Sequence, residues 1–179
     1  SEMGAPTSMS REDQAGSGSF HIETFVDEFR KFEFIRPLGD HAPTSMVAWE
    51  PIGVVGLITP WNWPMNQVTL KVIPAILAGN TVVLKPSEIA PLSSMVFAEV
   101  IDEAGLPKGV FNMVQGGRDT GAALLDAGID ALMFTGSGAA GAHFRRKFAD
   151  DPHVILALEL GGNNPLVVWD AADAEAVAG

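Results

Sequence analysis

ALMFTGSGAAGAHFRRKFADDPHVILALELGG, residues 131–162, predicts a strand, a glycine turn, a helix and a second strand in that order. The strands are the apolar runs 131–134 and 154–160, and the helix covers about residues 142–148. A glycine turn that opens a helix commonly holds a phosphate group, because small residues let backbone N–H groups approach and the helix N-terminus carries partial positive charge. The stretch therefore predicts a phosphate-bearing cofactor.

Glu159 is a carboxylate inside the second apolar run, and two glycines follow Leu160. A carboxylate among leucines is costly to bury unless it has a partner or a chemical task. Glu159 is therefore a candidate catalytic acid or base.

Residues 136–141 also fit the G-x-G-x-x-G pattern of a Rossmann unit, with Glu159 about 20 residues further on, where a ribose ligand is expected. That pattern belongs to the first strand–helix unit of a Rossmann domain, whereas about three strands are predicted before residue 131. Two alternatives stay open. One is an ordinary Rossmann reductase in which Glu159 binds ribose, and the other is a glycine turn with only a structural role.

The composition indicates one globular domain rather than a disordered chain, since 47% of the 179 residues are hydrophobic and 18% are charged. The net charge of −11 argues against nucleic acid and anionic membranes as partners. No apolar run approaches the ~20 residues of a membrane span, and residues 1–18 lack the apolar core of a signal peptide. A cytoplasmic location is the resulting expectation.

The chain contains no cysteine, which excludes disulfides, thiolate metal sites and a cysteine nucleophile within these residues. The four histidines are scattered without the spacing of metal ligands. We therefore expect no metal site.

Outside residues 131–162, unbroken apolar runs alternate with helix-like patterns, which predicts an α/β fold with a parallel, Rossmann-like sheet covered by helices on both faces. The helix at 68–77 contains Pro74, which should kink it or remove a backbone bond. The expected helices are about 22–32, 68–77, 91–104, 120–127 and 171–179, and the expected strands are 44–50, 53–59, 81–84, 110–114 and 165–168.

Polar residues and glycines gather where the predicted strands end. In parallel sheets, ligands bind beyond the carboxyl ends of the strands, so these residues are expected to share one site. They are Asn62, Lys85 with Glu88, Gly116, Ser137 and Glu159.

Two of these motifs suggest specific chemistry. Lys85 can donate to ribose hydroxyls or phosphate and Glu88 can accept from ribose hydroxyls, although a surface ion pair is the plainer interpretation of that motif alone. The amide of Asn62 can donate to a developing oxyanion, although a turn asparagine would explain the residue equally well.

Taken together, the motifs resemble the aldehyde dehydrogenase superfamily, NAD(P)-dependent enzymes that oxidise aldehydes through a cysteine thiohemiacetal. They occur along essentially the whole chain, in the order and spacing of that family. The motifs are EPIGVV (50–55), TPWNWP (59–64), AGNT (78–81), KPSE (85–88), AGLP (104–107), FTGS (134–137) and ELGG (159–162).

The resemblance implies a role for each matching residue. Asn62 would steady the oxyanion, and Lys85 and Glu88 would hold the adenosine ribose. Ser137 would contact the pyrophosphate, and Glu159 would be the general base, whose apolar surroundings should raise its pKa towards neutrality. The further cofactor-binding residues implied by the motifs are Thr59, Pro60, Trp61, Ser87, Gly116, Gly136, Gly141, Leu160 and Gly161.

The resemblance also implies a domain organisation. Residues 1–162 would form part of the NAD-binding domain, with 44–52 as a strand that pairs between subunits, and 163–179 would begin a catalytic domain. The family's first helices and its nucleophilic cysteine, which follows Glu159, are missing, so the chain is expected to be truncated at both ends. The full-length enzyme would be a homodimer or homotetramer.

The resulting hypothesis is a piece of an NAD-dependent aldehyde dehydrogenase that is inactive alone because it lacks the nucleophile. Glu88 favours NAD over NADP, because a carboxylate near the ribose repels a 2′-phosphate. The alternative is a non-catalytic nucleotide-binding or interaction module. Asn163-Asn164-Pro165 resembles the succinylglutamate-semialdehyde branch, whereas residues 1–64 resemble general aldehyde dehydrogenases, so no particular aldehyde is predicted.

Overall fold

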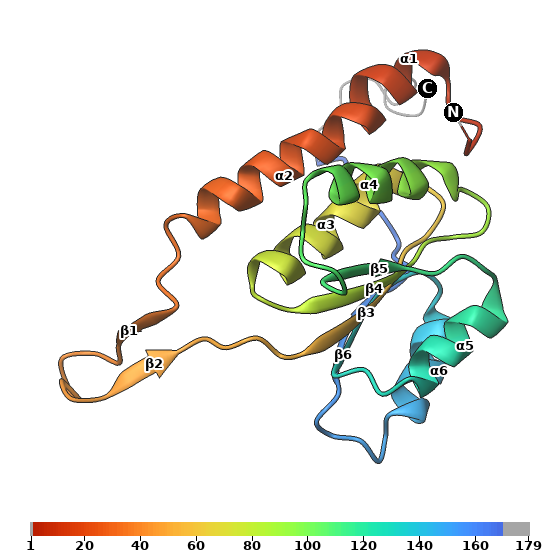
Figure 1. The fold of residues 1–179 in the computed structure, drawn as a ribbon. Helices are drawn as coiled ribbons and strands as arrows, with labels where there is room; N and C mark the ends of the chain where they lie inside the picture. Colours follow the sequence, from red (N-terminus) through yellow and green to blue (C-terminus); the bar gives the residue numbers. More distant parts are fainter. Residues whose placement is uncertain (1, 170–179) are drawn as a thin grey trace.

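The computed structural model describes residues 2–169 and contains a five-stranded parallel sheet in the order β5-β4-β3-β6-β7. Helices cover both faces of this sheet, which confirms the predicted α/β fold (Figure 1). The strands are β3 (Val54–Ile58), β4 (Thr81–Lys85), β5 (Phe111–Met113), β6 (Ala131–Thr135) and β7 (Ile155–Glu159).

The central strands form because their apolar side chains are buried on both faces of the sheet. Leu57, Leu84 and Leu132 have no exposed surface. Ile58 pairs with Lys85 of β4 on one side and with Phe134 of β6 on the other, so the carboxyl ends of these strands lie along one edge. The chain order reverses between β3 and β6, and such a switch point is where open α/β sheets bind ligands.

One face of the sheet is covered by α2 (Ala15–Phe29), α3 (Pro64–Leu77) and α4 (Leu92–Glu103), and the other by α5 (Arg118–Asp126) and α6 (Gly138–Lys147) (Figure 1). Each face has its own core of buried apolar side chains. The glycine turn predicted after residue 134 therefore leads into α6 on the second face.

Three helices are longer than their patterns predicted. The first begins at residue 7, as α1 (Thr7–Met9) and a π-helical turn η1 (Ser10–Gln14) lead directly into α2. α3 starts at Pro64, because a proline at the first position of a helix needs no N–H partner. α6 starts at Gly138, because the Ser137 hydroxyl accepts a hydrogen bond from the Ala140 N–H at 3.2 Å and caps the helix.

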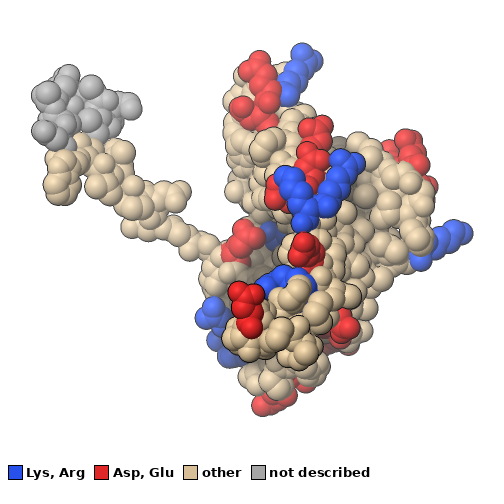
Figure 2. Space-filling view, turned by 90° about the vertical axis from the view of Figure 1, so that its left-hand side faces the viewer, with Lys and Arg blue, Asp and Glu red and all other residues tan. Residues whose placement is uncertain are grey.

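The strand predicted at 165–168 is wrong. Residues 161–169 have no secondary structure, and Figure 2 shows this segment as an arm that leaves the body of the molecule. Leu166 and Val167 are about three quarters exposed, at 75% and 76%. A strand needs a neighbour for its backbone hydrogen bonds, and no strand in residues 2–169 pairs with this run. The helix predicted at 171–179 lies outside the described residues.

A short hairpin projects from the body of the molecule between α2 and β3 (Figure 1). It consists of β1 (Ile35–Pro37) and β2 (Met46–Ala48), paired antiparallel. β2 confirms the extended conformation predicted at 44–50, whereas β1 was not predicted. The aromatic ring of Phe32 contacts the rings of Phe34 and Trp49 beside the hairpin.

Candidate functional site

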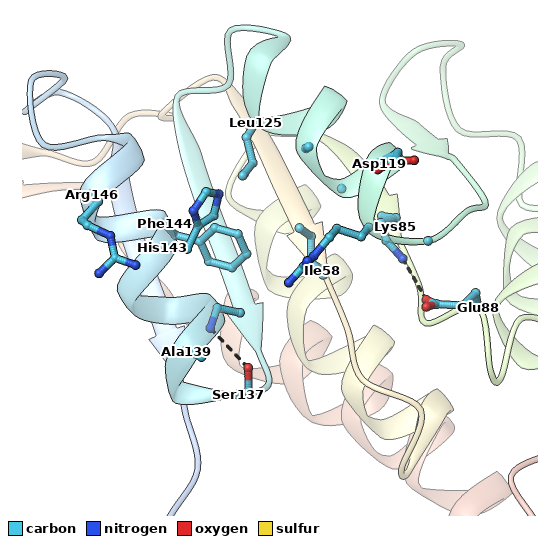
Figure 3. Close-up of a pocket in the computed structure, with 15 residues that line it drawn as sticks. Ile58, Lys85, Glu88, Asp119, Leu125, Ser137, Ala139, His143, Phe144 and Arg146 are labelled. Atoms are coloured by element: carbon cyan, nitrogen blue, oxygen red, sulfur yellow. Dashed lines mark hydrogen bonds and ion pairs between the residues drawn. The ribbon is translucent and has the colours of Figure 1, made fainter.

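A pocket of about 730 Å³ lies between α5 and α6, beyond the carboxyl ends of β3 and β4 (Figure 3). Its polar side chains come from loops after the strands and from the two helices, and its apolar wall comes from Ile58, Leu125 and Phe144. The remaining lining residues are Lys85, Glu88, Gly117, Arg118, Asp119, Gly121, Ala122, Ser137, Ala139, Ala140, His143 and Arg146.

Lys85 is held at the inner end of this pocket, and its side chain is only 7% exposed. Its Nζ donates to the carbonyl oxygens of Gly116 at 2.7 Å and Pro86 at 2.8 Å, and lies 3.5 Å from Glu88 Oε2 (Figure 3). These partners satisfy a buried ammonium group, whose burial would otherwise be costly. Lys85 therefore presents a fixed positive charge beside Glu88.

Glu88 keeps its carboxylate largely in solvent, with 58% of the side chain exposed. A hydrogen bond with its own main chain and the nearby Lys85 ammonium lower the pKa of Glu88, against a smaller opposing effect of desolvation. An ionised carboxylate only accepts hydrogen bonds, so Glu88 is suited to receive hydroxyl donors such as those of a ribose.

The N-terminus of α6 faces the same pocket. Ser137, Ala139 and Ala140 line it, and Gly138 has no other atom within 4 Å of the position that a Cβ would occupy. A phosphate could therefore approach the backbone N–H groups of this first turn, where the helix dipole favours an anion.

Gly141 was predicted to bind the cofactor, but it does not line the pocket and packs against Leu160 instead. A Cβ at Gly141 would lie 2.5 Å from a methyl carbon of Leu160, so this glycine lets α6 pack against the end of β7. Leu160 is the packing partner in that contact. A direct role of Gly141 or Leu160 in cofactor binding stays a prediction.

Glu159 ends β7 on the α3 side of the sheet and pairs with Lys71 of α3, whose Nζ lies 2.8 Å from Glu159 Oε1. The Lys71 side chain is 2% exposed, whereas that of Glu159 is 64% exposed. The expectation that Glu159 lies buried among apolar side chains is therefore wrong, because β7 is an edge strand whose α3-side residues are uncovered.

Lys71 is a functional candidate that sequence reasoning missed. The signal was a lone lysine in the apolar stretch 68–77, where a buried ammonium group must find an anion. Sequence alone could not show that the anion is Glu159, since the two residues come from different elements.

Asn62 lies in the loop between β3 and α3, and both Asn62 and Trp61 are exposed there. The next residue, Trp63, has a φ of 55°, in the left-handed region that non-glycine residues rarely adopt. Such a conformation requires support from its surroundings and is common at functional sites. Thr59 is buried at the start of this loop, and its N–H donates to the Lys85 carbonyl at 3.3 Å.

The structure brings some of the predicted cofactor residues together and leaves others apart. Lys85, Glu88 and Ser137 line the pocket, and Gly116 lies behind Lys85. Ser87 is buried in the turn after β4, where its Oγ accepts from the Ile89 N–H. The predicted cofactor residues that do not line the pocket are Thr59, Pro60, Trp61, Ser87, Gly116, Gly136, Gly141, Leu160 and Gly161.

Within the part of the chain that the structure describes, no group of His, Asp and Glu side chains could hold a metal ion. None of the described helices is long and apolar enough to cross a membrane.

Comparison with known proteins decides the family. The sequence profile described as "Aldehyde dehydrogenase family" matches residues 1–179. The chain belongs to the aldehyde dehydrogenase family. Because the whole chain matches this family, the interpretation as an ordinary Rossmann reductase is wrong. The ion pair of Glu159 with Lys71, on the face opposite the pocket, agrees with that correction.

The chain is similar to N-succinylglutamate 5-semialdehyde dehydrogenase of Caulobacter sp. (strain K31), with 61% identity over 70% of the chain and 26% of that protein. Its structure resembles that of an aldehyde dehydrogenase from Bartonella henselae, with a TM-score of 0.91 and 47% identity over 98% of the chain and 37% of that protein. It also resembles the C291A mutant of aldehyde dehydrogenase C from Pseudomonas syringae in complex with NAD+ and octanal. There the TM-score is 0.84, with 43% identity over 92% of the chain and 33% of that protein.

The chain therefore spans between about a quarter and two fifths of the length of these aldehyde dehydrogenases. The fold and the family are established for this segment.

Proposed function

We propose that this aldehyde dehydrogenase segment supplies the NAD site of an enzyme that oxidises an aldehyde to a carboxylic acid. The observation that carries the proposal is the pocket between α5 and α6, where the Lys85–Glu88 pair faces the capped N-terminus of α6. The similar Pseudomonas syringae protein was solved with NAD+ and an aldehyde.

The residues of the pocket fit the adenosine half of a dinucleotide. Its apolar wall of Ile58, Leu125 and Phe144 suits a planar base. Glu88 would accept hydrogen bonds from the ribose hydroxyls while Lys85 holds it by charge, and Ser137 with the first turn of α6 would bind the pyrophosphate. When bound, NAD accepts a hydride from the substrate.

Two residues are proposed to act on the substrate side of the enzyme. Asn62 would donate its amide N–H to an oxyanion, and Glu159 would take up a proton, with Lys71 fixing its carboxylate. Residues 163–179 are proposed to begin the catalytic domain that supplies the nucleophile. An aldehyde is the proposed substrate class, and the cytoplasmic location remains a prediction.

The proposal can be tested by titrating the chain with NAD in a calorimeter. Glu88→Gln should weaken binding about tenfold, since hydrogen bonds to a charged group are worth about 1.5–3 kcal/mol. Glu103→Gln is the matched control, because Glu103 is an exposed carboxylate at the end of α4 on the opposite face. Loss of affinity in Glu103→Gln equal to that in Glu88→Gln, or no binding of NAD by the parent chain, would contradict the proposal.

A non-catalytic nucleotide-binding module is the second candidate, since the 179 residues contain no cysteine. The same NAD site would then act without oxidation chemistry. The test is the activity of the complete protein that carries this segment, in which aldehyde-dependent formation of NADH excludes the module.

A further inference from the structure

The carboxylate of Glu2 binds the N-terminus of α4, 90 residues further along the chain. Its Oε2 accepts from the Leu92 N–H at 2.6 Å and its Oε1 from the Ser93 N–H at 2.9 Å. Figure 1 shows the N-terminal trace beside the end of α4 that follows the loop from β4. The N-cap residue of this helix is Pro91, whose side chain has no oxygen to accept a hydrogen bond. Glu2 therefore caps α4 in its place.

The segment around Glu2 is itself anchored to the body of the molecule. The Sδ atom of Met3 accepts from Gln14 Nε2 at 3.2 Å, and Gln14 is buried. Gln14 ends η1, which leads directly into α2, and α2 packs against α3. Hydrogen bonds to a carboxylate are stronger than those between neutral groups, and the helix dipole favours a negative charge at this end. Glu2 therefore fixes the first turn of α4 against an anchored part of the fold.

The first turn of α4 directly follows the turn that carries Glu88. The Ala90 N–H donates to the Ser87 carbonyl at 3.2 Å, so Glu88 is one of the two central residues of a β-turn. Ser87 and Ala90 are buried, whereas Glu88 keeps its carboxylate in solvent. The turn is held by β4 on one side and by α4 on the other. The position of Glu88 therefore depends on where α4 begins.

We propose that Glu2 is a positioning residue for the nucleotide pocket, because by capping α4 it holds residues 87–90 in the conformation that presents Glu88. The proposal rests on the proposed nucleotide site, in which Glu88 accepts hydrogen bonds from the ribose. Hydrogen bonds depend on distance and angle. A turn that shifts presents the Glu88 carboxylate in its binding position less often, and the affinity for the nucleotide falls by that fraction. Glu2 does not line the pocket and acts only through the backbone of α4.

The test is calorimetric titration of the chain with NAD. Glu2→Ala should weaken binding about threefold or more, because the N-terminus of α4 loses both of its acceptors. Charge alone predicts the opposite result, since removing a carboxylate favours an anionic nucleotide. Glu2→Gln keeps one acceptor oxygen and should weaken binding less than Glu2→Ala, and it replaces Glu2→Ala if that variant does not fold.

Two matched controls separate positioning from general effects on the fold and on charge. Asn80→Ala also removes the acceptor of two backbone N–H groups, but Asn80 precedes β4, at the other end of that strand from Glu88. Glu12→Ala also removes a carboxylate, which is exposed on η1. Neither control should change the affinity for NAD by more than about twofold, as expected for sites that are independent of the pocket.

A double-mutant cycle tests whether Glu2 acts through Glu88. In the Glu88→Gln background, Glu2→Ala should have little further effect on the affinity for NAD, because the ribose contact is already lost. Full additivity of the two substitutions, or an unchanged affinity in Glu2→Ala, would overturn the inference. A loss of affinity in Asn80→Ala equal to that in Glu2→Ala would overturn it as well, since reduced stability alone would then explain the effect. If NAD fails to bind the folded parent chain, the proposed nucleotide site itself is refuted.

Discussion

At the scale of single residues, Lys71 and Glu159 form an ion pair between a buried ammonium group and an exposed carboxylate. The Lys71 ammonium is almost fully buried, and its acceptor Glu159 reaches it from the open side of an edge strand. The lysine depends on the glutamate for its stability, whereas the solvated glutamate could remain charged without the lysine. The two residues should therefore respond unequally to substitution.

We expect Glu159→Ala to lower the free energy of unfolding by about 2 kcal/mol, because it leaves a buried ammonium without its anion. Lys71→Met should change it by less than about 1 kcal/mol, since an apolar side chain of similar length suits the buried position. Urea denaturation of both variants and of the double variant measures the difference. A greater loss for Lys71→Met than for Glu159→Ala would contradict this account of the pair.

The side chain of Asn80 forms hydrogen bonds with two other stretches of the backbone, and the residue is 6% exposed. Its Oδ1 accepts from the N–H groups of Ile52 and Gly53 at 2.7 and 3.1 Å, and its Nδ2 donates to the Ala75 carbonyl at 3.0 Å. Asn80→Ala should cost about 1–2 kcal/mol, because it leaves the N–H groups of Ile52 and Gly53 without the Asn80 acceptor at a partly buried place. Asn112→Ala is the control, since Asn112 is exposed and its side chain only donates hydrogen bonds, to two backbone carbonyls. A similar loss of stability in Asn112→Ala would argue against a special role of Asn80.

The lowered pKa of Glu88 makes a prediction about acid stability. A carboxylate whose pKa is lower in the folded state stabilises the fold at pH values above its unfolded pKa of about 4.3. That contribution is lost as the pH falls through the folded pKa. Urea midpoints measured from about pH 6 down to about pH 3 should therefore fall less steeply in Glu88→Gln than in the parent chain. Parallel curves for the two proteins would show that the interactions of the ionised Glu88 carboxylate, chiefly its hydrogen bond with its own main chain, add nothing to stability.

At the scale of elements, Gly138 and Gly141 at the start of α6 have different surroundings. The space around a Cβ at Gly138 is empty, whereas a Cβ at Gly141 would collide with Leu160. Gly138→Ala should therefore be neutral or stabilise the chain by up to about 1 kcal/mol, the usual gain of alanine over glycine in a helix.

Gly141→Ala should lower the melting temperature despite the same gain in helix propensity, because α6 and the end of β7 must move apart. Thermal unfolding followed by circular dichroism compares the two alanine variants directly. If Gly141→Ala is as stable as Gly138→Ala, Leu160 rotates away without cost, and the packing role of Gly141 is refuted.

Elements could be predicted from sequence where the local pattern alone determines them. The strands predicted at 53–59 and 131–134 are apolar runs and form as β3 and β6, whereas α6 begins four residues before the predicted start because Ser137 caps it. Residues 165–168 have the same apolar character but no partner strand in the described chain, so pattern alone predicted a strand there that does not form. The pairing of Lys71 with Glu159 depends on which edge β7 occupies, and no local pattern contains that information.

At the scale of the whole molecule, the proposed site consists of the α5–α6 pocket for the nucleotide and of Asn62 and Glu159 for catalysis, and these 179 residues contain no cysteine. The lining residues of the pocket on the α5–α6 side all come from residues 58–146 of this chain. The covalent step of the proposed oxidation requires a thiolate, and the chain has no cysteine. Binding and catalysis should therefore separate in experiments on the isolated chain.

The isolated 179-residue chain is expected to bind NAD and to show no aldehyde-dependent formation of NADH. Both can be measured on one preparation, by titration calorimetry and by NADH absorbance with an aldehyde present. Binding of NAD without formation of NADH is the result expected if these residues hold the cofactor and the nucleophile lies outside them. Formation of NADH above the rate without protein would contradict the requirement for a cysteine.

The projecting hairpin is the part of the molecule best suited to contact a second subunit. Ile35, Met46 and Trp49 are 67%, 56% and 54% exposed, and a two-stranded ribbon leaves the outer edge of each strand unpaired. Exposed apolar side chains on an unpaired edge favour pairing with another copy. We therefore expect the chain to self-associate through β1 and β2, in agreement with the strand predicted at 44–52.

Met46→Asp should shift the chain towards the monomer in sedimentation velocity at a fixed protein concentration, because it places a charge in the middle of the expected contact. Leu166→Asp is the matched control, since Leu166 is an even more exposed apolar residue, at 75%, on the arm after β7. If Leu166→Asp abolishes association and Met46→Asp does not, the contact lies on the arm. If both variants associate like the parent chain, neither apolar segment carries it, and the hairpin is not the subunit contact of this segment.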